Sequence, residues 1–150
     1  SFEGLPEELS GIDKFEKFNK GSYKSKYTPE EIKKSTDYAF TKIYKIWFDQ
    51  LSEKHIGFPA LLVHIDCDLY ISTQHVLNFL WENNLIQKNT LIAYDEFEST
   101  KNPELSGERR AHELYFGKDK PYQADEIWHN IYYDKSTGQR IRQSVFEVIS

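Results

Sequence analysis

The chain has 150 residues and a formal net charge of -5, and 29% of its residues are charged and 15% aromatic. A chain of this length can bury a real hydrophobic core, and this composition is typical of a folded protein rather than a disordered one. The acidic balance gives no basic footprint for nucleic acid, and no apolar run approaches the ~18 residues that a membrane span needs. We therefore expect one globular domain over residues 1–150, with neither nucleic acid nor a membrane as a partner.

Two residue counts bear on the origin of the chain. A single cysteine, Cys67, excludes an internal disulfide and favours a reducing compartment, so we expect a cytoplasmic protein. The chain contains no methionine, so Ser1 is not a translational start. We expect these residues to be a piece of a longer protein.

The first third of the chain is predicted to contain a loop, a short strand and a long helix. Residues 1–13 have the turn residues of a loop, and residues 15–18 have the composition of a short strand. Thr28 begins a capping-box pattern that Glu31 completes. Apolar side chains then recur at helical spacing, so we expect an amphipathic helix that ends near His55.

The middle of the chain is predicted to form a strand–helix–strand unit. Residues 60–65 are a continuous apolar run of strand length, which is typical of a strand covered on both faces by helices. Ser72 or Thr73 is expected to cap the helix that follows. Residues 90–94 form a second strand of the buried type.

The last third of the chain is predicted to contain a helix and a hairpin. The helix runs over residues 106–116, and Gly117 is its expected stop. Residues 126–133 and 140–149 read as two strands around a loop at 134–138. The whole pattern predicts an α/β fold.

Four acidic residues follow the two strands of the strand–helix–strand unit. Asp66 and Asp68 come after the first strand, and Asp95 and Glu96 end the second. A crossover helix makes the two strands parallel, and adjacent strands lie ~4.8 Å apart, so these acids should meet at the carboxyl edge of the sheet. Carboxylates so close repel one another unless a cation neutralises them, and Mg²⁺ prefers oxygen ligands. The pattern predicts a metal-assisted site, and the alternative is that the acids cap helices or line a solvated rim.

Other polar residues near this unit are weaker candidates. His64 lies within the apolar strand and is expected to be a hydrogen-bonded core residue. Cys67 has no basic partner within sequence reach and is a poor nucleophile candidate. Arg109 and Arg110 either meet an anionic substrate or belong to the surface.

Three ordered motifs resemble those of the macrocin O-methyltransferase (TylF-like) family. Residues 1–7 (SFEGLPE) resemble the family's DSFxGLPE loop, residues 65–73 (IDCDLYIST) its DGDLYxST motif, and residues 94–97 (YDEF) its DDY motif. The family consists of class I S-adenosylmethionine-dependent methyltransferases that act with Mg²⁺ mostly on sugar hydroxyls. The resemblance covers nearly the whole chain and implies a Rossmann-like fold with a mostly parallel sheet and a C-terminal antiparallel hairpin.

The resemblance also implies roles for particular residues. Asp66, Asp95 and Glu96 would hold the metal, and the catalytic residues would be Asp66 and Asp68. The cofactor would be S-adenosylmethionine. Ser1 and Phe2 would lie beside its ribose, and Ser22 and Tyr23 would lie near its adenine. A sugar-like small molecule with a free hydroxyl would be the substrate, and we expect a homo-oligomer.

The chain departs from the family pattern in three ways. Cys67 replaces the usual glycine, and Glu96 with Phe97 replaces Asp-Tyr. The family's first strand, its glycine-rich cofactor loop and its ribose-binding acid all precede the part that Ser1 begins. Without them the strand at 60–65 would have an unpaired edge.

Two other readings stay open. The Asp-x-Asp pattern after a strand also resembles the nucleophile motif of haloacid-dehalogenase-type phosphatases, in which Asp66 would be phosphorylated and Asp68 would act as an acid. The same pattern resembles the metal-binding acid pair of some glycosyltransferases. The third reading is a non-catalytic methyltransferase-like module for protein interaction or carbohydrate binding. The missing glycine-rich loop favours that reading for these 150 residues alone.

Overall fold

The chain divides into two compact units, residues 1–51 and residues 52–150. The computed structural model describes residues 2–5, 13, 21, 23–36, 41–55, 57–99 and 106–150. The strand predicted at residues 15–18 lies outside the described residues. Among the described residues, no helix combines the length and the apolar character that crossing a membrane requires.

Among its described residues, the first unit contains one short α-helix, α1 (Pro29–Thr36). The predicted capping box is confirmed, because the Glu31 amide donates to the Thr28 hydroxyl (3.2 Å) and the Thr28 amide donates to the Glu31 carboxylate (2.8 Å). The prediction of one long helix to His55 is wrong, since residues 41–47 have no regular secondary structure. That segment is rich in β-branched and aromatic residues, whose helix propensity is low. Two 3₁₀ turns follow it, η2 (Phe48–Gln50) and η3 (Glu53–His55), the second already in the second unit.

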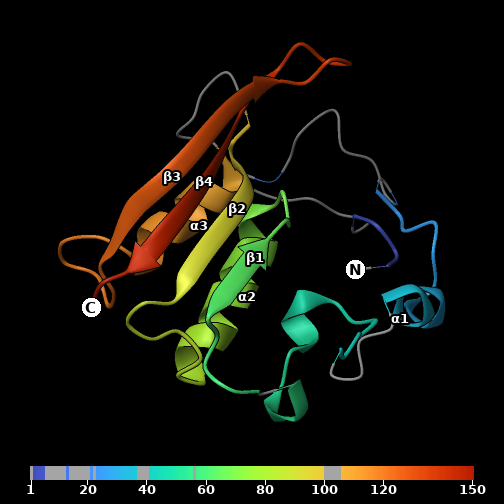
Figure 1. The fold of residues 1–150 in the computed structure, drawn as a ribbon, viewed down its shortest axis with the longest axis horizontal. Coiled ribbons are helices and arrows are strands. Elements are labelled where there is room, and N and C mark those ends of the chain that lie inside the picture. Colours follow the sequence, from blue (N-terminus) through green and yellow to red (C-terminus); the bar gives the residue numbers. More distant parts are fainter. Residues whose placement is uncertain are drawn as a thin grey trace. The chain divides into compact units, whose positions relative to one another are not determined.

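The second unit is built on a four-stranded sheet. Its strands are β1 (Leu62–Ile65), β2 (Leu91–Glu98), β3 (Ala124–Tyr133) and β4 (Arg140–Val148), arranged in the order β1-β2-β4-β3 (Figure 1). β1 and β2 run parallel, whereas β2–β4 and β3–β4 are antiparallel. The described sheet is therefore mixed rather than mostly parallel, and the predicted C-terminal hairpin is confirmed.

β1 lies at one edge of this sheet and pairs, among the described strands, with β2 alone. The expected unpaired edge is thus present. The prediction that both faces of this strand are covered is wrong, because 58% of the Leu62 surface is exposed and His64 is exposed as well. His64 is therefore not a core residue. An unbroken apolar run does not by itself require a covering layer on both faces.

Both α-helices of the second unit pack on the same face of the sheet (Figure 1). They are α2 (Tyr70–Glu82) and α3 (Gly107–Tyr115). α2 begins before the predicted caps, and Thr73 donates its hydroxyl to the carbonyl of Leu69 inside the first turn (2.9 Å). The core between helices and sheet is largely aliphatic and aromatic; its largest members include Ile65, Leu77, Ile92, Tyr94, Phe97, Phe116 and Phe146.

The hairpin loop between β3 and β4 is organised by one carboxylate. Asp134 Oδ1 accepts hydrogen bonds from the amides and hydroxyls of Ser136 and Thr137. These bonds, the Ser136 hydroxyl first, lower the pKa of Asp134 to about 2. Gly138 closes the loop with a φ of 67°, a conformation that glycine adopts without steric cost.

Candidate functional site

The register of β1 and β2 brings two of the predicted acids to the same edge of the sheet. Ile65 pairs with Tyr94 at the carboxyl end of this parallel pair. Asp66 and Asp95 are the next residues of their strands, so the predicted meeting of the two motifs at one edge is confirmed. In open α/β sheets this edge is where ligands bind.

β2 carries its acids in a bulge. Tyr94 pairs with Ser144, but the next pair is Glu98 with Arg142, so four steps along β2 match two along β4. Asp95, Glu96 and Phe97 lie between these pairs and outside the regular ladder. A bulge of this kind re-aims side chains and leaves backbone groups in need of other partners.

The segment after β1 turns sharply at the second acid of its motif. Asp68 has a φ of 56°, in the left-handed region, and the amide of Leu69 donates to the carbonyl of Cys67 (2.5 Å). This three-residue γ-turn with positive φ is the rare and strained form. Such strain is concentrated at functional segments, and it persists when the surrounding structure holds it.

One buried carboxylate connects the two acid-bearing segments. Glu108, in the first turn of α3, has a relative exposure of 1%. Its Oε1 accepts the amide hydrogen of Cys67 (3.1 Å) and its Oε2 accepts the amide hydrogen of Glu96 (3.1 Å). The carboxylate thereby satisfies one backbone donor in the turn after β1 and one in the bulge of β2.

The environment of Glu108 disfavours its charge. Burial raises the pKa of the Glu108 carboxyl to about 8, and the charges of Asp68 and Asp66 act in the same direction. The two backbone hydrogen bonds act against that rise, because they stabilise the carboxylate. The group is thus held at the edge of the sheet with a proton affinity far above that of an exposed glutamate.

Gly107 explains how α3 approaches so closely. A Cβ at this position would lie 2.5 Å from the amide nitrogen of Tyr70 and 2.6 Å from the carbonyl oxygen of Asp68. Both contacts are with backbone atoms, which cannot move aside as a flexible side chain can. The glycine therefore lets the start of α3 touch the start of α2, which brings Glu108 within reach of Cys67.

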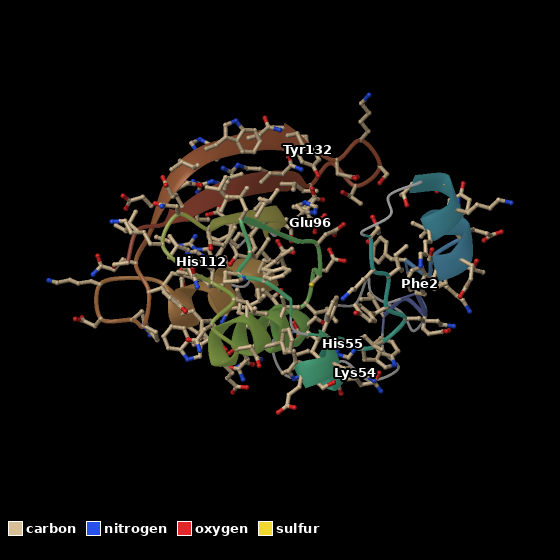
Figure 2. All side chains as sticks on the ribbon, turned by 60° about the horizontal axis from the view of Figure 1, so that its bottom comes forward. Phe2, Lys54, His55, Glu96, His112 and Tyr132 are labelled. Carbon is tan, nitrogen blue, oxygen red and sulfur yellow. The ribbon has the colours of Figure 1, made fainter. Side chains whose placement is uncertain are left out.

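The charges of the same acids also act on a tyrosine of β3. Burial raises the pKa of Tyr132, and the charges of Asp95, Glu96, Asp134 and Asp66, in that order, raise it further. Figure 2 labels Tyr132 and Glu96, which come from different strands of the sheet. No sequence pattern singled out Tyr132 or Glu108, because strand pairing and helix packing bring them to this edge.

Asp95 already has a protein partner. Its Oδ1 accepts a hydrogen bond from Nε2 of Gln143 on β4 (2.6 Å). Gln143 in turn lies near the amide of Asn130 on β3 (3.4 Å). These residues extend the polar character of the edge onto the sheet face opposite the two helices.

Three arginines hold the C-terminal end of the bulge, at Glu98. Glu98, which is buried, accepts hydrogen bonds from Arg109 (2.9 Å), Arg140 (3.3 Å) and Arg142 (3.2 Å). Arg109 also binds Glu113 one turn along α3 (2.9 Å). Arg109 and Arg110 were expected either to meet an anionic substrate or to belong to the surface. Arg109 instead contacts Glu98 of β2 and Glu113 of its own helix. The guanidinium of Arg110 lies 6.0 Å from the ring centre of Tyr70.

The described carboxylates at this edge are not grouped as a metal centre would be. Within the part of the chain that the structure describes, no three His, Cys, Asp or Glu side chains are grouped closely enough to hold a metal ion. Asp66, Asp95 and Glu96 share an edge without converging on one point. This arrangement gives no support for a bound divalent cation, and the predicted metal role of these residues stays a prediction.

The residues predicted to bind the cofactor belong to the first unit. Ser1 and Ser22 lie outside the described residues. Tyr23 has a φ of 61° and is 70% exposed. Phe2 lines a hollow of about 170 Å³ together with other side chains of that unit, namely Glu3, Lys45, Ile46, Trp47 and Gln50. Small-molecule pockets are typically ~300–1,000 Å³, so the described residues do not by themselves enclose a whole nucleoside cofactor.

Cys67 is unsuited to nucleophilic chemistry. Burial raises the pKa of its thiol to about 12, and the charges of Glu108 and Asp66 contribute to the rise. The thiolate, which is the reactive form, is therefore scarce at neutral pH. This agrees with the expectation from its sequence surroundings.

Comparisons with known proteins give one distant match. No protein-family model matches the chain, and no curated protein matches it. Among solved structures it is similar to the apo structure of a TDP-rhamnose 3'-O-methyltransferase, an enzyme in calicheamicin biosynthesis, with 22% identity and a TM-score of 0.31. The match covers 57% of this chain and 31% of that enzyme, so this chain corresponds to under a third of the enzyme's length. At this level of similarity the match carries no argument about activity.

Proposed function

We propose that the protein containing this chain is an S-adenosylmethionine-dependent O-methyltransferase that acts on a hydroxyl of a sugar or another small molecule. The acceptor side of its reaction is assigned to the carboxyl edge of β1 and β2. Asp66 and Asp68 are the residues proposed to act on the acceptor, and Asp95 is proposed to line the same site.

The observation that carries the proposal is the parallel register of β1 and β2. The motifs IDCDLYIST and YDEF, which resemble those of one methyltransferase family, are 20 residues apart in sequence yet end at the same edge because Ile65 pairs with Tyr94. The fold order of strand, helix, strand, helix and C-terminal hairpin also agrees with that resemblance. Two motifs that meet in space support a shared site more strongly than either motif does alone.

The chemistry asked of this edge is modest. S-adenosylmethionine supplies an electrophilic methyl group on a sulfonium sulfur. An acceptor hydroxyl has to be oriented and has to lose its proton, and a carboxylate is a suitable acceptor for that proton. Asp66 is exposed and Asp68 is half-buried, so a hydroxyl from solvent can reach both residues. Much of the rate enhancement then comes from positioning.

Methyl transfer is the direct test. The protein containing this chain is incubated with S-adenosylmethionine carrying a labelled methyl group and a panel of methyl glycosides. We expect labelled product from the parent protein and none from the double variant Asp66→Ala/Asp95→Ala. Retained turnover in the double variant would contradict the assignment of the site.

A matched control separates site loss from general damage. Asp125 is an exposed acid at the start of β3, where it pairs with Glu147 at the opposite end of the sheet. Asp125→Ala should leave transfer unchanged. Hydrolysis of p-nitrophenyl phosphate that depends on Asp66 would replace the proposal with the phosphatase reading.

A further inference from the structure

Glu108 stands out among the polar groups of the second unit because it is buried and yet bonded to two separate backbone segments. Neither of its partners lies in its own helix. The distances to the amides of Cys67 and Glu96 are equal, at 3.1 Å. A buried carboxylate is costly, and it is retained where it satisfies donors that nothing else reaches.

The two amides that it binds have lost their usual partners. β1 ends at Ile65, so Cys67 lies beyond the ladder with β2. Glu96 lies within the bulge, where the ladder between β2 and β4 is interrupted. Both amides are part-buried, and an amide shielded from water without a partner is destabilising, so one side chain satisfies two such donors.

The first turn of α3 also holds the far end of the bulge. Arg109, the next residue, donates to Glu98 at 2.9 Å. Glu96 and Glu98 are thus fixed from the same helix turn, one through its backbone and one through its side chain. Gly107 makes this possible, because any Cβ there would meet the backbone of Asp68 and Tyr70.

We propose that Glu108 is a positioning residue that holds the Asp66–Asp68 turn and the Asp95–Glu96 bulge in one fixed geometry, so that the acids of both segments act on the same acceptor. The fixed geometry is a property of the structure alone, whereas the joint action of the acids on one acceptor rests on the proposed methyl transfer. Glu108 does not touch the acceptor itself.

Amide hydrogen exchange tests whether Glu108 holds the two segments, whatever reaction the protein catalyses. In the full chain, Glu108→Ala should raise the exchange rates of the Cys67 and Glu96 amides at least ~10-fold, since both lose their acceptor. The amide of Val148, which donates to the Thr90 carbonyl at the other end of the sheet, should keep its rate. Unchanged exchange at both Cys67 and Glu96 would overturn the proposal.

Two further variants guard against simple unfolding. Glu108→Gln keeps a carbonyl oxygen that can accept one amide, so it should restore part of the protection. Asp125→Asn alters an exposed acid at the start of β3, at the opposite end of the sheet, and should behave as the parent does. If Glu108→Ala does not fold, Glu108→Gln decides: protection equal to the parent at both amides would contradict a role for the carboxylate.

Steady-state kinetics test whether the geometry held by Glu108 matters for methyl transfer. With labelled S-adenosylmethionine and the methyl glycoside that the parent methylates best, Glu108→Gln should lower kcat at least ~10-fold and leave KM for the glycoside within about twofold. Unchanged kcat together with faster amide exchange would overturn the catalytic part of the proposal and keep the structural part. A parent protein that transfers no methyl group to any glycoside would refute the proposed function instead, and the exchange result would stand by itself.

Discussion

Residues 52–150 and residues 1–51 differ in what stabilises their secondary structure. In residues 52–150 three strand ladders and two helices enclose a buried core. In residues 1–51 the described helix, α1, buries none of its side chains, and its start is held by the capping box of Thr28 and Glu31. The comparison teaches that a local signal determines where a helix begins, whereas burial determines how far it continues.

The largest expected effect comes from the core of the second unit. Leu77 on α2 is fully buried, so Leu77→Ala should lower the free energy of unfolding by about 3–4 kcal/mol through lost burial and a cavity. Denaturant unfolding followed by tryptophan fluorescence measures the change. An effect below about 1 kcal/mol would mean that α2 is not part of a packed core.

A smaller effect should appear as a pH dependence carried by Glu108. The pKa of this carboxyl is about 8 in the folded chain against an ordinary value of 4.5, so the folded state binds more protons than the unfolded state between these two pKa values. Its stabilising contribution is complete below the unfolded pKa and is lost as the pH rises through the folded pKa. From pH 5.5 to pH 7 the parent should lose roughly 2 kcal/mol relative to Glu108→Gln.

The Glu108→Gln variant makes this measurement specific. Burial lowers the pKa of His112 to about 3, so His112 also contributes a pH dependence, of opposite direction, on the acid side. That contribution is common to parent and variant and cancels in their difference. Parallel stability curves for the two proteins would contradict the raised pKa of Glu108.

The smallest expected effect concerns the first unit. Thr28→Ala removes the hydroxyl that accepts the Glu31 amide, and loss of such a cap costs about 1 kcal/mol. The change should shorten or weaken α1, as measured by NMR Cα chemical shifts of its residues. Unfolding of residues 52–150 should keep its midpoint, and a shift there would contradict a purely local role for the cap.

Much of the second unit was predictable because its signals are local and redundant. Turn residues at 134–138 between two strand-like runs are enough to predict a hairpin, and Asp134 does organise that loop. The parallel pairing of β1 and β2 followed from the helix between them, and with it the shared edge of Asp66 and Asp95. α3 begins at Gly107 and ends before Gly117, close to the predicted bounds of that helix.

The parts that were missed depend on long-range packing. A bulge in β2 has no sequence signal here, since no glycine marks it. Glu108 looked like an ordinary acid in a first helical turn, and only the contact of α3 with two strand ends, 41 and 12 residues away, gives it its role. The exposure of β1 was mispredicted for a similar reason, because the number of layers around a strand is a property of the whole fold.

The central claim is that the strand ends of β1 and β2 form one functional site, and a double-mutant cycle on methyl transfer tests it most directly. Transfer rates are measured for the parent protein, Asp66→Asn, Asp95→Asn and the double variant. The account predicts that the combined loss differs from the product of the single losses by at least ~5-fold, because residues acting at one site are coupled. Independent losses that multiply within error would contradict it.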